Sequence, residues 1–251
     1  MKCGVRFTSS RVRYSACRTC SSRDVEPRLP LTIDRILRAH GDWPAEVARA
    51  LAEAPRPIAP DPRLWPGDPD AAPRRVPDFG HVGPPRQAST LLLLYPADTG
   101  ELVMPLTVRR PDLRAHAGEI SLPGGAVDPS DASPQAAALR EAEEEIGVPA
   151  ASVQVLGALD EVWIPVSNYR LRPFVGALAG RPALYPRQEE VAEIVELPLS
   201  ALFGAEALVE ELIEGPGWQL RAGAYRWAGH RIWGATARTL SMLATVLATR
   251  D

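Results

Sequence analysis

Three glutamates at helical spacing are the side chains of this sequence best placed to do chemistry. Glu141, Glu144 and Glu145 stand at positions i, i+3 and i+4, which share one face of an α-helix. Like charges so close together repel one another, and near the C-terminal end of a helix the macrodipole disfavours them further. Local stability therefore does not explain the three carboxylates, whereas a bound cation would. Ligands that are all oxygen atoms favour Mg²⁺ or Mn²⁺.

The helix that carries these glutamates has a recognisable beginning and end. Ser133 is a suitable N-cap, and Pro134 fits the first helical position because its missing N–H would be unpaired there. Gly147 is the expected C-terminal stop. An apolar stripe on the same segment would pack the helix against a sheet: Leu139, Ala142 and Ile146.

The loop before the helix could bring main-chain atoms to the same ion. Pro123-Gly124-Gly125 lets the backbone bend tightly and approach a ligand without intervening side chains. A carbonyl there could join the metal shell, and Asp128 and Asp131 add oxygen atoms nearby. An acidic run alone is usually a solvated helix face. The glycine pair, the acidic loop and the capped helix together favour a metal site.

This combination resembles the Nudix box, Gly-x5-Glu-x7-Arg-Glu-U-x-Glu-Glu-x-Gly-U, in which U is aliphatic. The second half of the box matches at seven positions: Arg140, Glu141, Ala142, Glu144, Glu145, Gly147 and Val148. The first half departs from it. Counted from Gly125, the acidic residue is Asp131 rather than Glu, and eight residues rather than seven separate it from Arg140.

That departure resembles one branch of the Nudix hydrolases, the coenzyme A pyrophosphatases, which carry the loop form Gly-Gly-x-x-Asp-Pro-x-Asp. The stretches 106–125 and 232–238 also resemble that branch, whereas Pro105, Arg110 and Leu122 depart from its signature. The resemblance spans about Gln87 to Leu247. It implies hydrolysis of the pyrophosphate of coenzyme A, or of its derivatives, to 3′,5′-ADP and 4′-phosphopantetheine or its acyl form.

The resemblance also implies roles for individual residues. Glu141, Glu144 and Glu145 would hold Mg²⁺ or Mn²⁺, with the carbonyl of Gly125 as a further ligand, and Arg140 would orient the glutamates.

A further carboxylate usually comes from outside the box, as a ligand or a general base. Glu190 is our choice for it, and Glu189 is the second choice.

Substrate binding is expected from residues before and within the glycine loop. Arg109, Arg114, His116 and Gly124 could meet phosphates, including the 3′-phosphate that marks coenzyme A. Three aromatic residues could stack on adenine or could belong to the core: Trp163, Tyr169 and Trp233.

Two other functions remain open at this point. One is a Nudix pyrophosphatase for another nucleoside diphosphate, such as ADP-ribose. The other is a non-catalytic Nudix domain that binds a nucleotide, although a pure sensor has no use for three repelling glutamates.

Around this segment, strands alternate with a few helices. Strands are expected at Thr90–Tyr95, Leu102–Arg109, Val153–Leu159, Tyr169–Leu178, Glu190–Leu197 and Trp218–Trp227, the last as a strand or hairpin. Helices are expected at Ser133–Ile146 and Gly234–Arg250. The alternation implies an α/β fold with a mixed sheet packed between helices. The resemblance makes this the α/β/α sandwich of the Nudix hydrolases.

The chain before residue 87 is expected to differ from the rest. Residues 1–30 contain a basic, Ser-rich tail, which is disordered or leader-like. Residues 31–86 form an extension, with a helix from Thr32 to Ala54 that Gly41 and Pro44 break, then a Pro-rich loop or linker from Pro55 to Pro85. The Nudix domain would occupy residues 87–251.

The bulk composition narrows the partners. A formal net charge of −3 gives no reason to expect nucleic acid or an anionic membrane as partner, and the expected partner is a small nucleoside diphosphate. The three cysteines all lie within the first twenty residues, which is typical of a reduced, cytoplasmic protein. The sequence does not decide the oligomeric state, and a homodimer stays open.

Overall fold

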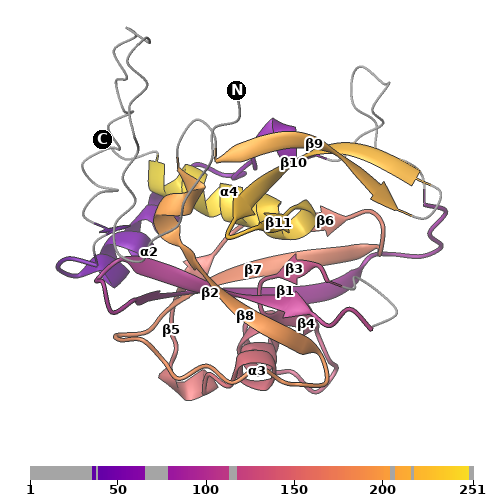
Figure 1. The fold of residues 1–251 in the computed structure, drawn as a ribbon. Coiled ribbons are helices and arrows are strands. Elements are labelled where there is room, and N and C mark those ends of the chain that lie inside the picture. The colour runs from indigo at the N-terminus through magenta and orange to yellow at the C-terminus, as the bar shows by residue number, and fades with distance from the viewer. Residues whose placement is uncertain are drawn as a thin grey trace, which may run out of the picture.

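The structure is a computed structural model that describes residues 36–37, 39–65, 79–112, 118–203, 207–215 and 218–248 (Figure 1). The expected basic tail lies outside the described residues, as do most of the helix expected before Gly41 and the substrate-binding candidates Arg114 and His116.

The helices, short 3₁₀ turns and strands follow one another in this order: α2 (Trp43–Glu53), η1 (Pro62–Leu64), β1 (Arg86–Pro96), β2 (Leu102–Arg109), β3 (Ile120–Ser121), β4 (Gly124–Ala126), α3 (Pro134–Ile146), η2 (Ala150–Ser152), β5 (Gln154–Ala158), β6 (Val162–Ile164), β7 (Tyr169–Ala177), β8 (Val191–Pro198), η3 (Leu199–Leu202), β9 (Leu208–Gly215), β10 (Trp218–Trp227), β11 (His230–Ile232) and α4 (Gly234–Ala248).

A mixed sheet of eight strands forms the centre. Its main path runs β3-β2-β1-β7-β5, with β4 paired to β1, β6 to β7 and β8 to β2. Strands β1 and β7 are parallel over nine residue pairs, and the other pairings in this sheet are antiparallel. The mixed sheet expected from the sequence is therefore confirmed.

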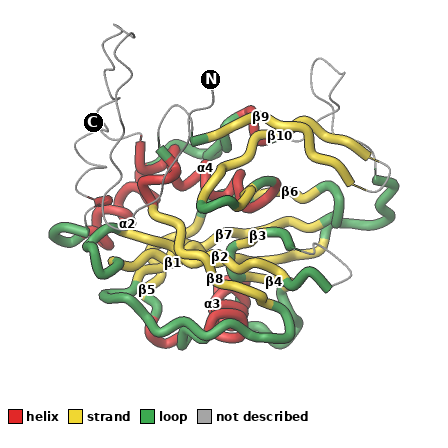
Figure 2. Tube along the Cα trace, viewed as in Figure 1, coloured by secondary structure: helices red, strands yellow, loops and turns green. Residues whose placement is uncertain are grey.

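Strand β1 explains why the sheet lies between two layers of helices. Successive side chains of a strand point to opposite faces, and Leu91 to Leu94 are all fully buried. Leu91 and Leu93 belong to the hydrophobic cluster that contains helix α3, whereas Leu92 and Leu94 belong to the cluster that contains α2 and α4. The views agree: α3 covers one face of the sheet, and α2 and α4 cover the other (Figures 1 and 2). The α/β/α sandwich is confirmed.

The N-terminal extension packs into the same core. Helix α2 begins at Trp43, after the non-helical residues 39–42, with the side chain of Asp42 as its cap and Pro44 in its first turn, so the break expected at Gly41 and Pro44 is confirmed. Val47 and Leu51 of α2 are buried against residues of α4 and the central sheet. The division of the chain at residue 87 stays a prediction, but α2 and the expected domain share one hydrophobic cluster.

The first part of the Pro-rich segment is anchored, so of the two expected alternatives, a loop or a linker, it is a loop packed on the core. Ile58 and Leu64 are buried in the core. The N–H of Ile58 donates to Asp160 at 2.6 Å, and the N–H of Asp61 donates to Ser241 Oγ at 2.9 Å. Two isolated apolar residues among prolines give no periodic signal, which is why the sequence pattern missed this contact.

A second sheet of three antiparallel strands, β9-β10-β11, lies beyond α4, so that α4 runs between the two sheets (Figure 1). The expected strand Trp218–Trp227 is β10, and the sequence analysis missed its partner β9. No helix within the described residues is long and apolar enough to cross a membrane.

Candidate active site

Helix α3 has the predicted ends. Ser133 has an extended backbone, and its hydroxyl accepts the N–H of Ala136 at 3.1 Å. Gly147 ends the helix in the left-handed conformation, with φ of 74°. Ala142 and Ile146 are buried against the sheet, and α3 packs on strands β1 and β4 of that sheet.

The glycine pair brings the backbone of β4 close to both β1 and α3. A Cβ at Gly124 would lie 2.4 Å from the carbonyl oxygen of Ser89, and a Cβ at Gly125 would lie 2.5 Å from Glu141 Oε1. The backbone contact at Gly124 excludes any larger residue there, whereas a larger residue at Gly125 would displace the carboxylate of Glu141. Glycine is therefore required so that the carboxylate of Glu141 can lie directly against the Gly125 backbone.

Glu145 is the most buried of the three glutamates, with 4% of its surface exposed. Its Oε2 accepts the N–H of Gly124 at 3.1 Å. Burial, reinforced by the negative charges of Glu141 and Glu190, raises the pKa of Glu145 to about 7. A carboxylate held in this state is costly unless a cation compensates it.

Glu141 is mostly buried as well, and burial raises its pKa, with the charges of Glu144 and Glu190 adding to the effect. Glu144 is more exposed, at 41% of its side chain. Because Glu190 acts on the pKa of both Glu141 and Glu145, the fold brings it to the cluster, as the sequence analysis expected.

The loop of residues 178–190 places Glu190 by crossing beside α3 (Figure 2). The N–H of Arg187 donates to the carbonyl of Glu145 at 3.0 Å, and the Arg187 guanidinium lies 3.3 Å from Glu144 and 3.8 Å from Glu190. Glu189 is 78% exposed and pairs only loosely with Arg187, at 3.8 Å. Of the two candidates, Glu190 is the one that faces α3.

Arg140 ties the cluster to the loop before it. Its guanidinium binds both oxygens of Asp131, at 2.9 and 3.0 Å, and also contacts Glu141 at 2.9 Å and Glu144 at 3.3 Å. The side chain of Asp131 is only 5% exposed, and it also accepts the N–H of Asp128. Arg140 lowers the pKa of Asp131. Asp131 was expected to add an oxygen near the ion, and the structure instead assigns both of its oxygens to anchoring Arg140.

Asp128 also has a local role. Its carboxylate accepts the N–H of Ser130 at 2.8 Å and the Ser130 hydroxyl at 2.7 Å, which closes the turn between β4 and α3. Asp128 also lines a hollow together with Arg140, Glu141 and Glu144.

The donor set suits a divalent ion. Glu141, Glu144, Glu145 and Glu190 supply oxygen atoms only, and two of these carboxylates have raised pKa values from burial and mutual repulsion. As they stand, no three acidic, His or Cys side chains of the described residues converge on one point, because Glu141 and Glu144 turn toward Arg140.

A cavity of about 500 Å³ opens beside the glycine pair. Arg109, at the end of β2, lines it, and the Nε of Arg109 is buried without a hydrogen-bond partner in the described part of the chain. The charge of Arg109 also lowers the pKa of Glu145, against the dominant effect of burial. Arg109 therefore lies near both Glu145 and the cavity, and its contact with phosphate stays a prediction.

Two of the three aromatic candidates line this cavity, namely Tyr169 and Trp233, whereas Trp163 is 43% exposed and lines a different groove. The sequence analysis missed Arg238, a buried arginine of α4 that lines the same cavity. A single arginine within an apolar helical stripe was the available signal.

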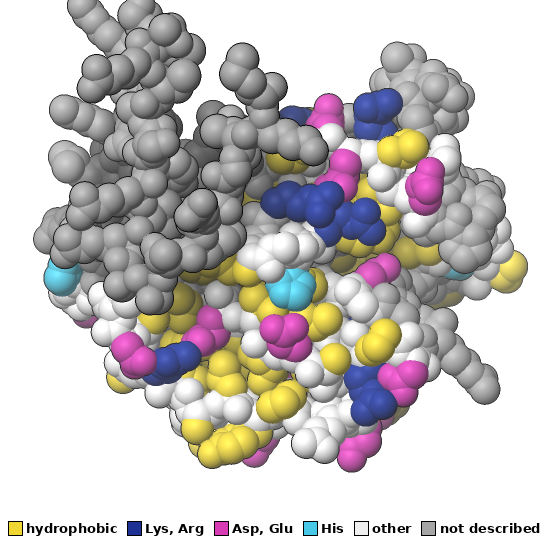
Figure 3. All heavy atoms as spheres, viewed as in Figure 1, with side chains coloured by type: hydrophobic (Ala, Val, Ile, Leu, Met, Phe, Trp, Pro, Cys, Tyr) yellow, Lys and Arg dark blue, Asp and Glu magenta, His cyan; other side chains and the backbone are white. Residues whose placement is uncertain are grey.

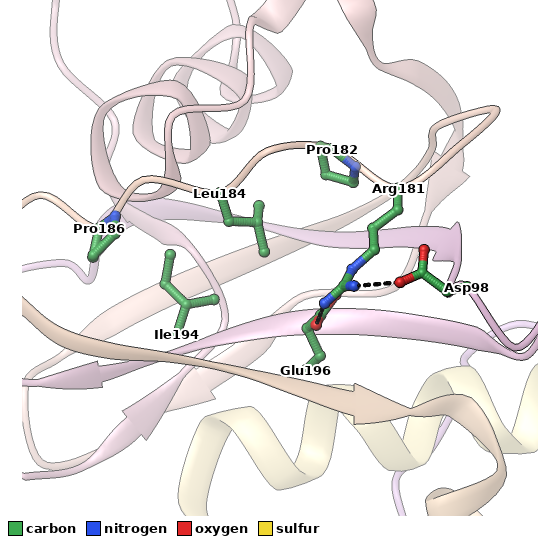
Figure 4. Close-up of a pocket in the computed structure, with 7 residues that line it drawn as sticks. All are labelled: Asp98, Arg181, Pro182, Leu184, Pro186, Ile194 and Glu196. Carbon is green, nitrogen blue, oxygen red and sulfur yellow. Dashed lines mark hydrogen bonds and ion pairs between the residues drawn. The ribbon is translucent and has the colours of Figure 1, made fainter.

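A second hollow, of about 540 Å³, lies on the α3 side of the molecule (Figure 4). There Arg181 reaches between Asp98 and Glu196, and Glu196 also accepts the hydroxyl of Tyr95 at 2.8 Å. The Arg181 guanidinium is already neutralised by two carboxylates, so this hollow is an ion-pair cluster that holds the 178–190 loop.

On the face shown in Figure 3, basic and acidic side chains are interspersed.

Comparison with known proteins gives a consistent result. The NUDIX domain family model matches residues 85–227. A protein of Pectobacterium atrosepticum described as an uncharacterized Nudix hydrolase NudL is 36% identical over 174 residues, which covers 69% of this chain and 89% of that protein. A NudL of Photorhabdus laumondii is 41% identical over 142 residues, covering 55% of this chain and 74% of the relative.

Among solved structures, the Nudix hydrolase RenU of M. smegmatis aligns with a TM-score of 0.40 at 28% identity, over 47% of this chain and 74% of that one. The NUDIX domain of Shewanella oneidensis NrtR, in complex with ADP ribose, aligns with a TM-score of 0.38 at 19% identity, over 47% and 76%.

Proposed function

This chain belongs to the NUDIX domain family and is a Nudix hydrolase, and from that membership we propose that it hydrolyses the pyrophosphate bond of coenzyme A or its derivatives. The products would be 3′,5′-ADP and 4′-phosphopantetheine or its acyl form. The reaction would depend on Mg²⁺ or Mn²⁺, and the enzyme would work in the cytoplasm.

One observation carries the hydrolytic part of the proposal. Glu141 and Glu145 of α3 lie against the backbone of Gly125 and Gly124, the charge of Glu190 acts on both, and burial raises the pKa of Glu145 to about 7. Mutual repulsion makes this arrangement unfavourable for folding alone. It is favourable once a divalent ion sits among the carboxylates.

The residues of the box are assigned to binding the divalent ion. Glu141, Glu144 and Glu145 would hold the ion, and the carbonyl of Gly125 is a further donor. A bound divalent ion neutralises the diphosphate, polarises the P–O bond and lowers the pKa of the attacking water. Arg140, held by Asp131, orients the carboxylates of Glu141 and Glu144.

Two further residues would act on the reacting groups. Water adds to one phosphorus, the bridging P–O bond breaks, and the bridging oxygen leaves with the other phosphoryl group. Glu190 is the residue that we assign to accept the proton from water. Arg109 would face the negative charge that builds up on the phosphoryl oxygens.

We favour coenzyme A as the substrate because three parts of the sequence resemble the coenzyme A pyrophosphatases. They are the loop Gly124-Gly125-x-x-Asp128-Pro129-x-Asp131 and the stretches 106–125 and 232–238. Another nucleoside diphosphate, such as ADP-ribose, is the alternative substrate. A nucleotide-binding domain without catalysis is the alternative function.

Mass spectrometry of the products tests the proposal. The purified chain is incubated with coenzyme A or with ADP-ribose, each with Mg²⁺, with Mn²⁺ or with EDTA. We expect 4′-phosphopantetheine from coenzyme A with a metal ion, none with EDTA, and less turnover of ADP-ribose. Turnover of ADP-ribose alone would replace the substrate but keep the chemistry.

A matched pair of variants tests the catalytic role of the cluster. Glu144→Gln is expected to lower kcat by about 10³-fold, because the ion loses a charged ligand. Glu143→Gln on the next position of α3 is the control, since Glu143 is exposed and accepts the N–H of Ala150 away from the cluster. Equal turnover in both variants would remove Glu144 from the catalytic machinery, whereas no turnover by the wild type with either substrate and either metal ion would leave the non-catalytic function.

A further inference from the structure

The cavity beside the glycine pair combines an apolar lining with two guanidinium groups and one carboxylate, that of Glu119. Its walls come from β4, from the turn between β6 and β7, and from the first turn of α4. Arg109 lies at the end nearest the carboxylates, and Arg238 comes from α4. A ligand whose diphosphate lies at Glu141 and Glu145 could therefore extend into this cavity.

Arg238 is a buried charge without a counter-charge. Only 1% of its surface is exposed. Its nitrogen atoms donate to two carbonyls, that of Trp163 at 2.9 Å and that of Gly234 at 3.3 Å, and its guanidinium lies 5.0 Å from the ring centre of Trp65. No acidic side chain of the described residues pairs with it. Burial lowers its pKa to about 10, which reflects the cost of keeping the charge there.

The beginning of α4 adds positive potential to the same wall. Gly234, Ala235 and Thr236 line the cavity, and the first N–H groups of a helix have no partner within the helix. The macrodipole of this 15-residue helix places partial positive charge at this end, and no acidic residue stands in its first turn. The helix end and Arg238 are separate sources of positive potential directed at one space.

The hydrogen bonds of Arg238 also connect α4 to β6 through the Trp163 carbonyl. A purely structural arginine would explain those bonds. It would not explain why a full charge is kept beside an open cavity, since a neutral donor could make the same contact at lower cost.

We propose that this cavity receives the nucleotide half of the substrate and that Arg238, with the first turn of α4, selects a ribose that carries an additional phosphate. The aromatic rings of Tyr169 and Trp233 give the base an apolar surface, and the anionic group neutralises the buried guanidinium. This inference rests on the proposed function, because the ribose 3′-phosphate of coenzyme A is the group in question.

The test compares coenzyme A with dephospho-coenzyme A, which differ only in the ribose phosphate. We expect the wild type to favour coenzyme A by at least about 10-fold in kcat/KM, as one charge-assisted contact to phosphate implies. Arg238→Met should reduce that ratio to near one while turnover of dephospho-coenzyme A stays within about 3-fold. Arg238→Lys should keep most of the preference, because it keeps the charge.

Arg49→Met is the control, since Arg49 is an exposed residue of α2. Equal turnover of both substrates by the wild type overturns the inference, and so does an equal loss on both substrates in Arg238→Met. If Arg238→Met does not fold, as judged by its melting transition, the wild-type ratio and Arg238→Lys still decide.

Binding without turnover separates this inference from the proposed function. Calorimetry in EDTA measures the affinity of the wild type and Arg238→Met for 3′,5′-ADP and for 5′-AMP. If coenzyme A is not hydrolysed but 3′,5′-ADP binds about 10-fold tighter than 5′-AMP only when Arg238 is present, the subsite stands and the hydrolysis of coenzyme A falls. If coenzyme A is hydrolysed and both nucleotides bind equally, the subsite falls and the hydrolysis stands.

Discussion

Arg140 and Arg238 are two arginines on helices packed against the central sheet, and they handle their charge in opposite ways. Arg140 contacts three carboxylates, and both oxygens of Asp131 are given to it. Arg238 contacts only carbonyls and an aromatic ring. The first arrangement fixes geometry, because every charge has a partner inside the protein. The second leaves a charge for a ligand to neutralise.

The same contrast separates the two halves of the candidate site. On the α3 side, an excess of carboxylates needs a cation, and on the α4 side an excess of cations needs an anion. A diphosphate with a divalent ion satisfies both sides at once.

Glu190→Gln should lower kcat by about 10²-fold, whereas Glu189→Gln should change it by less than about 2-fold. The adjacent residues differ in placement, since only Glu190 affects the pKa of Glu141 and Glu145. Steady-state kinetics with saturating Mg²⁺ measures both variants. A larger loss in Glu189→Gln would assign the outside carboxylate to our second choice, and no loss in either would remove it from the mechanism.

In EDTA, the free energy of unfolding should fall as pH rises from about 4.5 to about 7, by on the order of 2 kcal/mol from Glu145. The reason is that the folded state keeps a proton on Glu145 in this window, while the unfolded state has released it. Urea unfolding at pH 5 and at pH 7.5 measures the difference. In Glu145→Gln the fall should be smaller by about this amount.

Saturating Mg²⁺ should reverse the trend, because the ion binds the ionised carboxylates of the folded state and stabilises it. A wild-type curve in EDTA that matches that of Glu145→Gln at both pH values would show that Glu145 is not strained. The claim that the carboxylates on the α3 side need a cation would then lose its main support.

Asp131→Asn should lower kcat by about 10-fold without changing the substrate preference. The amide can still accept from Arg140, but the bidentate ion pair is lost, so the guanidinium holds Glu141 and Glu144 less firmly. Metal titration of the activity should show weaker apparent metal affinity. Asp131→Glu, which keeps the charge, should recover part of the loss, and failure of both variants to affect metal affinity would make Asp131 a loop residue only.

The sequence predicted the acidic half of the site far better than the basic half. The box from Gly124 to Val148 is one continuous segment, so its helix ends, glycine bend and carboxylate spacing are all visible in local pattern. Arg238 and Glu190 join the site only through packing between segments far apart in the chain. Their roles depend on burial and on neighbours, which spacing does not record.

The fold shows the same division. Strand β1 and helix α3 were predicted because they have strong local signals, whereas β9 was missed because its glutamates obscure the alternation and its order comes from pairing with β10. The contact of Asp131 with Arg140 was also not visible in the sequence, since an acidic residue near a metal box is equally suited to bind the ion or to bind an arginine.

Loss of the ion-pair cluster around Arg181 (Figure 4) should have the smallest effect on activity, so it serves as a control for the comparison of Arg140 with Arg238. Arg181, like Arg140, lies between carboxylates and holds a loop, and the loop it holds leads to Glu190. If internal pairing of charges were by itself a sign of function, Arg181→Met would reduce activity as Asp131→Asn does.

For Arg181→Met we expect a change of less than about 2-fold in kcat/KM and of less than about 2 °C in melting temperature, because an exposed ion pair contributes little. The Glu190 backbone is held separately, by hydrogen bonds with Arg110 and Arg187, so the loop end should stay in place without Arg181. A loss of 10-fold or more would mean that the whole 178–190 loop, and not only its last residues, positions the acidic half of the site.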